Sequence, residues 1–463
     1  MSTQPRSCRG LNRRDVLRFG SVGLASAALG PLCAHKAPAA DATTNDPAVI
    51  FVWLPGGPPH QDTFDMKPDA PDEYRGAFKP IKTNVTGTQI CEHLPHLAKV
   101  TDRYSIIRSV AHTFADHGGG HKRFLTGRDP LQQVGFVNDT PMVGSMVAEV
   151  LKSKRAAVPN YIAGVDGGRQ HIDTFSFGSA YLGPQSHPLF VPGDPADNKF
   201  EVKDLSVLPE TEGKLKDRLA LLDTFDAPLI GPDLAGRAEG MTAARARALD
   251  LITTDTAKHA FDLAKESPKT RGRYGMHRYG QRALLARRLV EAGASWVTMV
   301  MENATPPGED LKKDHTYNWD SHAVNCHIFE DTRYKLGFLD QAISALIEDL
   351  YTRGLNKRVL LVVTGEFGRT PRLEYDKATG RPGRDHWPQA QSILVSGACK
   401  AGITVGSTTA RAEVPKDRPL TPNDLWATVF THLNIDFKAI NFTDGTGRPI
   451  PMLPHGDVIS ELV

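Results

Sequence analysis

Carboxylate and imidazole side chains follow four apolar runs that lie far apart in this sequence. Side chains of these types can act as acids, bases or metal ligands. In chain order the groups are His60, Asp62 and Asp65; His112, Asp116, His117 and His121; Asp320 and His322; and Glu366, Asp385 and His386. Carboxylate oxygen and imidazole nitrogen form the donor set of zinc, manganese or iron, and the carboxylate share also admits calcium or magnesium. The pattern predicts a divalent-metal site if the fold brings the groups together.

Each of these residues also has an ordinary structural interpretation. An Asp-His pair in a loop can be a solvated turn or a cap, and Glu366 can form an ion pair with Arg369 or Arg372. Asp385 can orient His386 without either side chain touching a metal. The joint placement of the groups after successive apolar runs favours the metal site over these readings. The two arginines suit an anionic ester or carboxylate substrate.

The apolar runs that precede these groups have the length and composition of buried strands. They are short, rich in β-branched residues and bounded by turn residues, which favours strands over buried helices. The runs cover residues 48–54, 105–111, 296–301, 358–364 and 391–397. In an open α/β sheet, ligands bind at the carboxyl ends of the strands, so the polar groups stand where a site is expected.

Helical segments lie between these runs, and the alternation predicts the fold class. Residues 336–350 and about 279–292 have apolar side chains at helical spacing and end near glycine, and Thr421 with Pro422 marks another helix start. We expect an α/β fold with a mostly parallel central sheet sandwiched by helices. Residues 40–463 would form a single domain, with a cap or insertion at about 165–270, where the pattern is less regular.

The first 39 residues have the features of an export signal. Arg13 and Arg14 precede a modest apolar segment at 22–29, and residues 37–39 read "APA", a small-residue cleavage site. The apolar segment is too short and too rich in glycine to span a bilayer. A short amphipathic helix is the alternative. We expect a twin-arginine signal peptide at 1–39, and therefore a periplasmic or secreted protein.

Composition narrows the range of partners. The 463 residues include 55 basic and 53 acidic side chains, for a net charge of +2. This balance gives no electrostatic footprint for nucleic acid or an anionic membrane. Once the signal is removed, Cys91, Cys326 and Cys399 remain, and an odd, widely spaced set is not a disulfide framework.

Several ordered blocks resemble a known family. They are "GGPPHQDTFDMKPDAP", "YRGAFKPI", "RYGQRALLARRLVEAGASWVTM", "NWDSHAVN", "VVTGEFGRTPR", "GRDHWPQAQSILVSGA" and "TPNDLWATVFTHLNID". In that order they resemble the exported bacterial family catalogued as domain of unknown function 1501, from about residue 47 to the carboxyl end. That family is similar to the alkaline phosphatase and sulfatase superfamily, whose sheet carries metal ions at its strand ends. The block "RFLTGR" at 123–128 resembles the "LLTGR" that follows the sulfatase nucleophile.

The resemblance implies roles for particular residues. Asp320, His322 and His386 are similar to the Asp/His set that holds a metal in the phosphatases. Glu366 stands where sulfatases have an aspartate ligand, and Asp62 would substitute for aspartates that Gly56 and Gly57 replace. Asp385 would complete the metal-binding set by orienting an imidazole, and Arg369 would face the anion.

The chain departs from the superfamily at the nucleophile. Counting back from Gly127, the nucleophile position falls on His117, and the position of its supporting arginine falls on His121. No serine, threonine or cysteine stands there. His117 would therefore act as a base or, as the alternative, as the nucleophile itself.

These inferences together predict a metal-dependent hydrolase of a sulfate, phosphate or similar anionic ester. The substrate would be a small anionic or saccharide-linked ester. Zinc is the first expectation for the cation, with calcium and manganese as alternatives. The rival is a non-catalytic binding or assembly protein that keeps the fold and a residual metal and works beside a protein partner. A structural surface protein without metal is the third reading.

Overall fold

The apolar runs form one large sheet in the computed structural model, which describes residues 45–154, 157–166, 175–202 and 254–463 and the single positions 214, 217, 221 and 251. Neighbouring strands are parallel except that β13 is antiparallel to both β4 and β8. The mostly parallel sheet is thereby confirmed. Within the described ranges its eight strands follow the order β14 (Thr404–Val405), β4 (Tyr104–Val110), β13 (Gln391–Gly397), β8 (Val359–Thr364), β1 (Ala48–Trp53), β7 (Trp296–Val300), β5 (Tyr161–Val165) and β6 (Leu189–Pro192).

All five runs predicted as strands are strands of this sheet. They are β1, β4, β7, β8 and β13, and each agrees with its prediction to within one residue at either end. The strands that the pattern did not reveal are β5, β6 and β14, which lie towards the two edges of the sheet. They have between two and five residues, too few for a distinct periodic signal.

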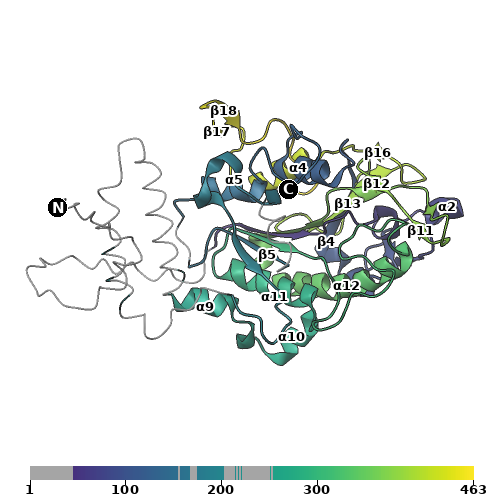
Figure 1. Cartoon of the computed structure of the whole chain (residues 1–463), viewed down its shortest axis with the longest axis horizontal. Helices are drawn as coiled ribbons and strands as arrows, with labels where there is room; N and C mark the ends of the chain where they lie inside the picture. The colour runs from purple at the N-terminus through teal and green to yellow at the C-terminus, as the bar shows by residue number, and fades with distance from the viewer. Residues whose placement is uncertain are drawn as a thin grey trace, which may run out of the picture. The chain divides into compact units, whose positions relative to one another are not determined.

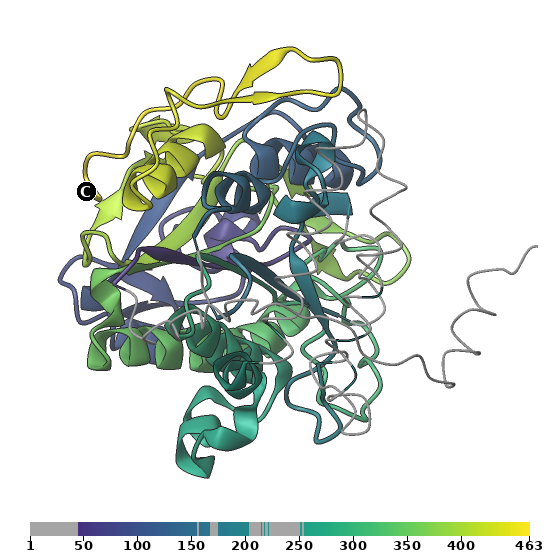
Figure 2. The same cartoon turned by 90° about the vertical axis from the view of Figure 1, so that its left-hand side faces the viewer.

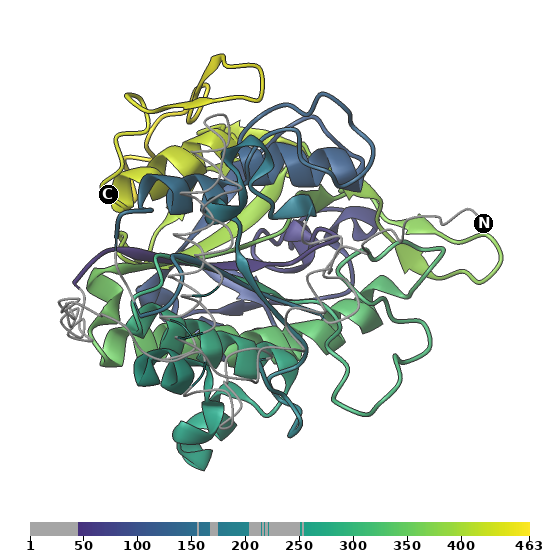
Figure 3. The same cartoon turned by 60° about the vertical axis from the view of Figure 1, so that its left-hand side comes forward.

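Helices cover both faces of the sheet (Figure 1). Along β1, Ile50 and Val52 pack into one apolar core while Phe51 and Trp53 pack into the other, as the two-residue period of a strand requires. The two layers lie on opposite sides of the sheet when the structure is turned (Figures 2 and 3). The first core includes α3 (Pro95–Ala98), α9 (Asp255–Phe261), α10 (Pro268–Tyr274), α11 (Arg278–Glu291) and α12 (Ile328–Thr352), and the second includes α4 (His117–Thr126), α5 (Val143–Val150) and α13 (Pro422–His432).

The helix ends show which sequence signals were informative. The start of α13 is confirmed, because Thr421 and Asp424 form a capping box and Pro422 takes the first turn. In contrast, α12 begins at Ile328, eight residues before the predicted start at 336. Its first turns bury an ion pair between Asp331 and Lys335, 2.6 Å apart, on the inner face. The charged pair interrupts the apolar spacing, so the pattern did not indicate these turns.

Five short two-stranded ribbons accompany the central sheet in the described residues. The ribbon that matters for the site pairs β9 (Gly368–Arg369) with β12 (His386–Trp387), and places Arg369 directly opposite His386. The others are β2 (Pro80–Lys82) with β3 (Gln89–Cys91), β10 (Glu374–Tyr375) with β11 (Pro382–Gly383), β15 (Ser407–Thr408) with β16 (Pro415–Asp417), and β17 (Asn441–Thr443) with β18 (Pro449–Pro451); a single helical turn, α2, covers Asp72–Arg75.

Two predicted segments fall wholly or partly outside the described residues. The export signal at 1–39 lies entirely outside them. Most of the cap expected at about 165–270 also lies outside, although β6 within it joins the central sheet as an edge strand. Among the described residues, no helix combines the length and the apolar character needed to cross a membrane.

Candidate metal centre

Loops from four strands meet at one edge of the sheet. The loop after β7 carries Asp320 and His322, Glu366 comes directly after β8, and α4, which follows β4, begins with His117. His386 precedes β13, and because β13 is antiparallel to β8, its amino end lies at the edge where the parallel strands have their carboxyl ends. Residues separated by more than 260 positions are thus brought to one place.

Two groups of ligand atoms form at this edge. In each group the atoms lie within 4.8 Å of one another. The first group consists of His117, Asp320, His322 and His386, and the second consists of His117, His121 and Glu366. Every member was expected at the site from its position in the sequence, and His117 belongs to both groups.

In the first group, two imidazoles present the same nitrogen to one carboxylate oxygen. Oδ1 of Asp320 lies 2.7 Å from Nε2 of His322 and 3.0 Å from Nε2 of His386, and the two Nε2 atoms are 3.0 Å apart. Nδ1 of His322 donates to Asp385 at 2.5 Å, and Nδ1 of His386 donates to the carbonyl of Ala115 at 2.7 Å. Because both acceptors are oxygens, Nδ1 carries the proton in each ring, and each Nε2 offers a lone pair. Metal-binding histidines have this arrangement.

The second group surrounds a fully buried carboxylate. Glu366 is 0% exposed, and both of its oxygens accept from the backbone N–H of Gly56, at 2.9 and 3.1 Å. Its Oε1 lies 2.8 Å from Nδ1 of His117 and 3.4 Å from Nε2 of His121. Gly56 has φ +107°, and a Cβ there would lie 2.5 Å from the backbone nitrogen of Asp320. Glycine therefore allows the loop after β1 to approach both acidic residues.

The two carboxylates and the shared imidazole strongly perturb one another. Burial alone would raise the pKa of Glu366, but the imidazoles of His121 and His117 hold it well below its usual range. Burial would likewise raise the pKa of Asp320, and its contacts with His117, His322 and His386 and the charge of Arg369 keep it far below normal. Burial lowers the pKa of His117, yet its contacts with Asp320 and Glu366 raise it to about 9. The site thus strongly favours positive charge between its carboxylates.

Arg369 reaches the centre from the interior of the protein, and its Nη1 lies 3.3 Å from Nε2 of His322. Its side chain is 0% exposed. Its guanidinium donates to Asp320 Oδ1 at 2.7 Å and to the backbone carbonyls of Gly56, Gly57, Trp319 and Arg384. With these donors committed to the interior, the side chain joins the loops after β1 and β7 to the β9–β12 ribbon. The expected contact of Arg369 with a substrate anion stays a prediction.

Asp62 is also placed away from both groups. It lies in the short turn η1 (His60–Asp62), where both of its oxygens accept from the buried guanidinium of Arg384, at 2.8 and 3.3 Å. The structure therefore gives Asp62 an ion-pair partner in place of the expected metal. Asp116 has an ordinary role as the N-cap of α4, accepting from the N–H groups of Gly118 and Gly119.

Several contacts that orient the ligands could not be predicted from the sequence. His112, already a candidate polar residue, bonds through Nε2 to the backbone carbonyl of Glu366 at 2.7 Å, and Ala115 contributes only its carbonyl. The ring of Phe367 packs against both His117 and His386, with centroids 5.4 and 4.6 Å away. Backbone carbonyls carry no side-chain signal, so only the adjacency of Phe367 to Glu366 could have indicated any of these roles.

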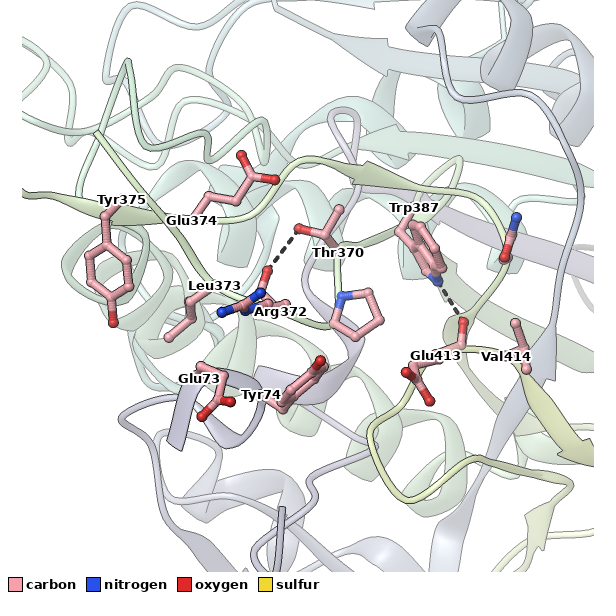
Figure 4. A pocket seen from close by; sticks show the side chains of 12 residues that line it. Glu73, Tyr74, Thr370, Arg372, Leu373, Glu374, Tyr375, Trp387, Glu413 and Val414 are labelled. Atoms are coloured by element: carbon pink, nitrogen blue, oxygen red, sulfur yellow. Dashed lines mark hydrogen bonds between the residues drawn. The ribbon is translucent and has the colours of Figure 1, made fainter. Parts of the chain in front are cut away.

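A hollow of about 720 Å³ is built on the same ribbon. Alternation along β12 places His386 in the metal centre and Trp387 in the hollow. The indole of Trp387 donates to the carbonyl of Glu413 at 2.6 Å (Figure 4). The other aromatic and acidic residues of its lining are Tyr74, Tyr375, Glu73 and Glu374. The β9–β12 ribbon thus contributes side chains both to the polar, aromatic hollow and to the metal centre.

The chain is similar to several solved structures at low identity. The phosphonate monoester hydrolase of Agrobacterium radiobacter is 11% identical with a TM-score of 0.38, covering 90% of this chain and 77% of that one. BT1596, a 2-O GAG sulfatase, is 10% identical with a TM-score of 0.37, covering 90% and 74%. The lipoteichoic acid synthase LtaP from Listeria monocytogenes is 10% identical with a TM-score of 0.36, covering 88% and 74%. Nothing about the site follows from likenesses of this size.

No curated protein matches the sequence. A family model does match, over residues 46–463, which include every residue of both ligand groups. The chain belongs to the family described as "Protein of unknown function (DUF1501)".

Proposed function

We propose that this protein is a metal-dependent hydrolase of an anionic ester, such as a sulfate or phosphate ester. One observation carries the proposal. The Nε2 lone pairs of His322 and His386 and an oxygen of Asp320 converge within 3.0 Å, while both Nδ1 atoms are committed elsewhere. Three electron-rich atoms this close repel one another unless positive charge lies among them. Arg369 lies 2.7 Å from Oδ1 of Asp320 and 3.3 Å from Nε2 of His322, so it bonds to two of the three atoms, and a metal cation would contact all three.

The chemistry of the ligands fits a divalent cation. Imidazole nitrogens outnumber carboxylates in both groups, which favours zinc and leaves manganese and calcium as alternatives. When bound, such a cation supplies a Lewis acid for the ester oxygen and lowers the pKa of a water. Asp320 and Glu366 would hold the cation through oxygen, and the histidines of the two groups through nitrogen.

The chain's other residues hold these ligands in place. Asp385 fixes the ring of His322, Arg369 fixes Asp320, and the N–H of Gly56 fixes Glu366. The hydroxyl of Ser321, next to Asp320, donates to Asp331 at 2.7 Å and is therefore not a free nucleophile. We infer that water attacks the ester directly, without a covalent intermediate on a serine, threonine or cysteine.

Asp385→Asn tests the proposal without removing a ligand. Loss of a carboxylate that orients a metal-bound imidazole typically lowers metal affinity or activity by about 10- to 100-fold. The leaderless protein would be assayed by metal analysis, chelator competition and a panel of 4-nitrophenyl sulfate, phosphate and phosphonate esters. We expect chelator-sensitive turnover that is reduced in Asp385→Asn and restored by excess metal. Asp72→Asn, at an exposed pair with Arg75, is the matched control and should change neither property.

The outcomes separate the rival functions. Stoichiometric metal without turnover of any ester would overturn hydrolysis and favour the binding or assembly protein, which works beside a protein partner. Protein without bound metal would favour a structural role. The substrate class, a small anionic or saccharide-linked ester, and twin-arginine export to the periplasm or medium belong to the same proposal. Cell fractionation that finds the protein in the cytoplasm alone would contradict the export.

A further inference from the structure

His117 lies between the two ligand groups and presents one ring nitrogen to each. Its Nδ1 is 2.8 Å from Oε1 of Glu366 in the second group. Its Nε2 is 3.2 Å from Oδ2 of Asp320 in the first group. The two nitrogens of an imidazole point away from each other, so one ring serves both carboxylates. Neither nitrogen is left to act as the base or nucleophile that the sequence suggested.

The distances are those between neighbouring ligands of a common cation. Two atoms that each lie about 2.1 Å from one metal are roughly 3.0 to 3.4 Å apart, for angles between a right angle and the tetrahedral angle. In the first group Asp320 lies 2.7 to 3.2 Å from the imidazole nitrogens. In the second group Glu366 lies 2.8 and 3.4 Å from them. Three of these five distances fall in that range, and the other two are 0.3 and 0.2 Å shorter. Both groups are therefore close to the spacing of a ligand set, and His117 is a member of each.

We propose that His117 bridges two divalent cations as an imidazolate. One cation is held with Asp320, His322 and His386, and the other with His121 and Glu366. A neutral imidazole has a lone pair on only one nitrogen, so the bridging ring gives up its remaining N–H proton to solvent. The inference rests on the metal-binding part of the proposed function and is independent of ester hydrolysis.

Neither carboxylate needs His117 as a hydrogen-bond donor. Glu366 accepts from the N–H of Gly56, and Asp320 accepts from Arg369. The ring itself is fixed in position by Phe367 and by His386, whose centroid is 4.2 Å away. A preformed ring between two independently supported carboxylates is the arrangement that a bridging ligand requires.

The charges also favour two cations over one. Two divalent cations would face the carboxylates of Asp320 and Glu366 and the imidazolate, beside Arg369 and Asp385, whose charges offset each other. One positive charge remains for an anionic ligand. This net positive charge would attract a substrate anion, the role that the sequence suggested for Arg369. A single cation in the first group would leave Glu366 with only the imidazoles as counter-charge.

The competing arrangement needs no bridging metal. In it, His117 is an imidazolium that pairs with Glu366 on one side and Asp320 on the other. The two arrangements differ in the number of bound ions and in whether those ions interact. Copper(II) distinguishes them, because two copper(II) ions joined through one imidazolate couple magnetically and lose most of their electron paramagnetic resonance signal.

The experiment loads chelator-stripped, leaderless protein with copper(II) and measures both stoichiometry and integrated spin. We expect two coppers per chain with far less spin than two isolated ions give. His121→Ala should bind one copper with its full signal, since it disables only the second group. His117→Ala should show no coupled pair. His315→Ala, at a half-buried histidine outside both groups, is the matched control and should keep two coupled ions.

One copper per wild-type chain, or two coppers with full, uncoupled spin, would overturn the bridge. Both results come from the wild-type protein, so they do not depend on the folding of any variant. A protein that binds one metal and turns over esters would keep the proposed function and lose the bridge. A coupled pair without ester turnover would do the reverse.

Discussion

At the scale of single residues, Arg369 holds the loops of the centre together. We expect Arg369→Met to lower the free energy of unfolding by about 3–5 kcal/mol, because it removes the guanidinium from the carboxylate of Asp320 and a donor from buried carbonyls such as that of Trp319. Urea unfolding of the metal-free protein measures the change, so that loss of metal does not contribute.

The neighbouring Arg372 supplies the control for this prediction. It is exposed and lines the hollow, so Arg372→Met should change stability by no more than about 0.5 kcal/mol. If the two substitutions lowered the free energy of unfolding equally, Arg369 would not be the residue that holds the loops together. In that case the expected contact of Arg369 with a substrate anion would return as the better explanation of its position.

At the scale of elements, the centre depends on how closely α4 approaches the end of β8. Gly120 lies in α4, and a Cβ there would lie 2.9 Å from the ring of Phe367 and 3.4 Å from Cγ of Glu366. We expect Gly120→Ala to cost about 1–3 kcal/mol by overpacking. It should also weaken binding in the second ligand group, because Phe367 and Glu366 must shift away from the helix. Urea unfolding and copper stoichiometry measure the two effects.

A second helix supplies the matched glycine. Gly337 lies in α12 on an exposed face, and a Cβ there would meet nothing within 4 Å. Gly337→Ala should therefore stabilise the protein by roughly 0.5–1 kcal/mol, since alanine loses less backbone entropy in a helix. Stabilisation by both substitutions would mean that α4 and β8 are not as close as the structure places them.

For the whole molecule, acid stability should depend on His60. Its ring is 1% exposed, and Nε2 donates to the carbonyl of Ala412 at 2.9 Å. Burial lowers its pKa from 6.5 to about 4. Between these values the unfolded chain binds a proton that the folded protein does not, so stability falls as the pH falls from 6.5 towards 4. The loss attributable to this group approaches about 3 kcal/mol at pH 4.

His60→Asn removes this titration and should flatten the decline. The measurement compares urea unfolding of the metal-free wild type and variant at pH 7.5 and pH 5, since protons also compete for the metal ligands. We expect the variant to be less stable at pH 7.5 but to lose less stability on acidification. The same loss in both proteins would assign the acid sensitivity to other groups.

Local patterns in the sequence were enough to predict the main strands and to select the candidate residues of the site. The runs that became β1 and β8 are almost entirely apolar, and Thr421 with Pro422 marks the start of α13, because such signals act over a few residues. Glu366 was nominated because it follows a buried strand. His386 was selected from the segment that follows the same strand, and the family resemblance added its similarity to a metal-holding Asp/His set.

Only the tertiary structure showed which of the candidate side chains lie close together. Asp62 pairs with Arg384, more than 300 residues away, and Arg369 bonds to carbonyls that no side-chain pattern reveals. The direction of β13 brings His386 to the edge, and the position of α4 turns both nitrogens of His117 towards carboxylates. These outcomes depend on strand direction and long-range hydrogen bonds, which packing of the whole sheet sets and which residue spacing does not encode.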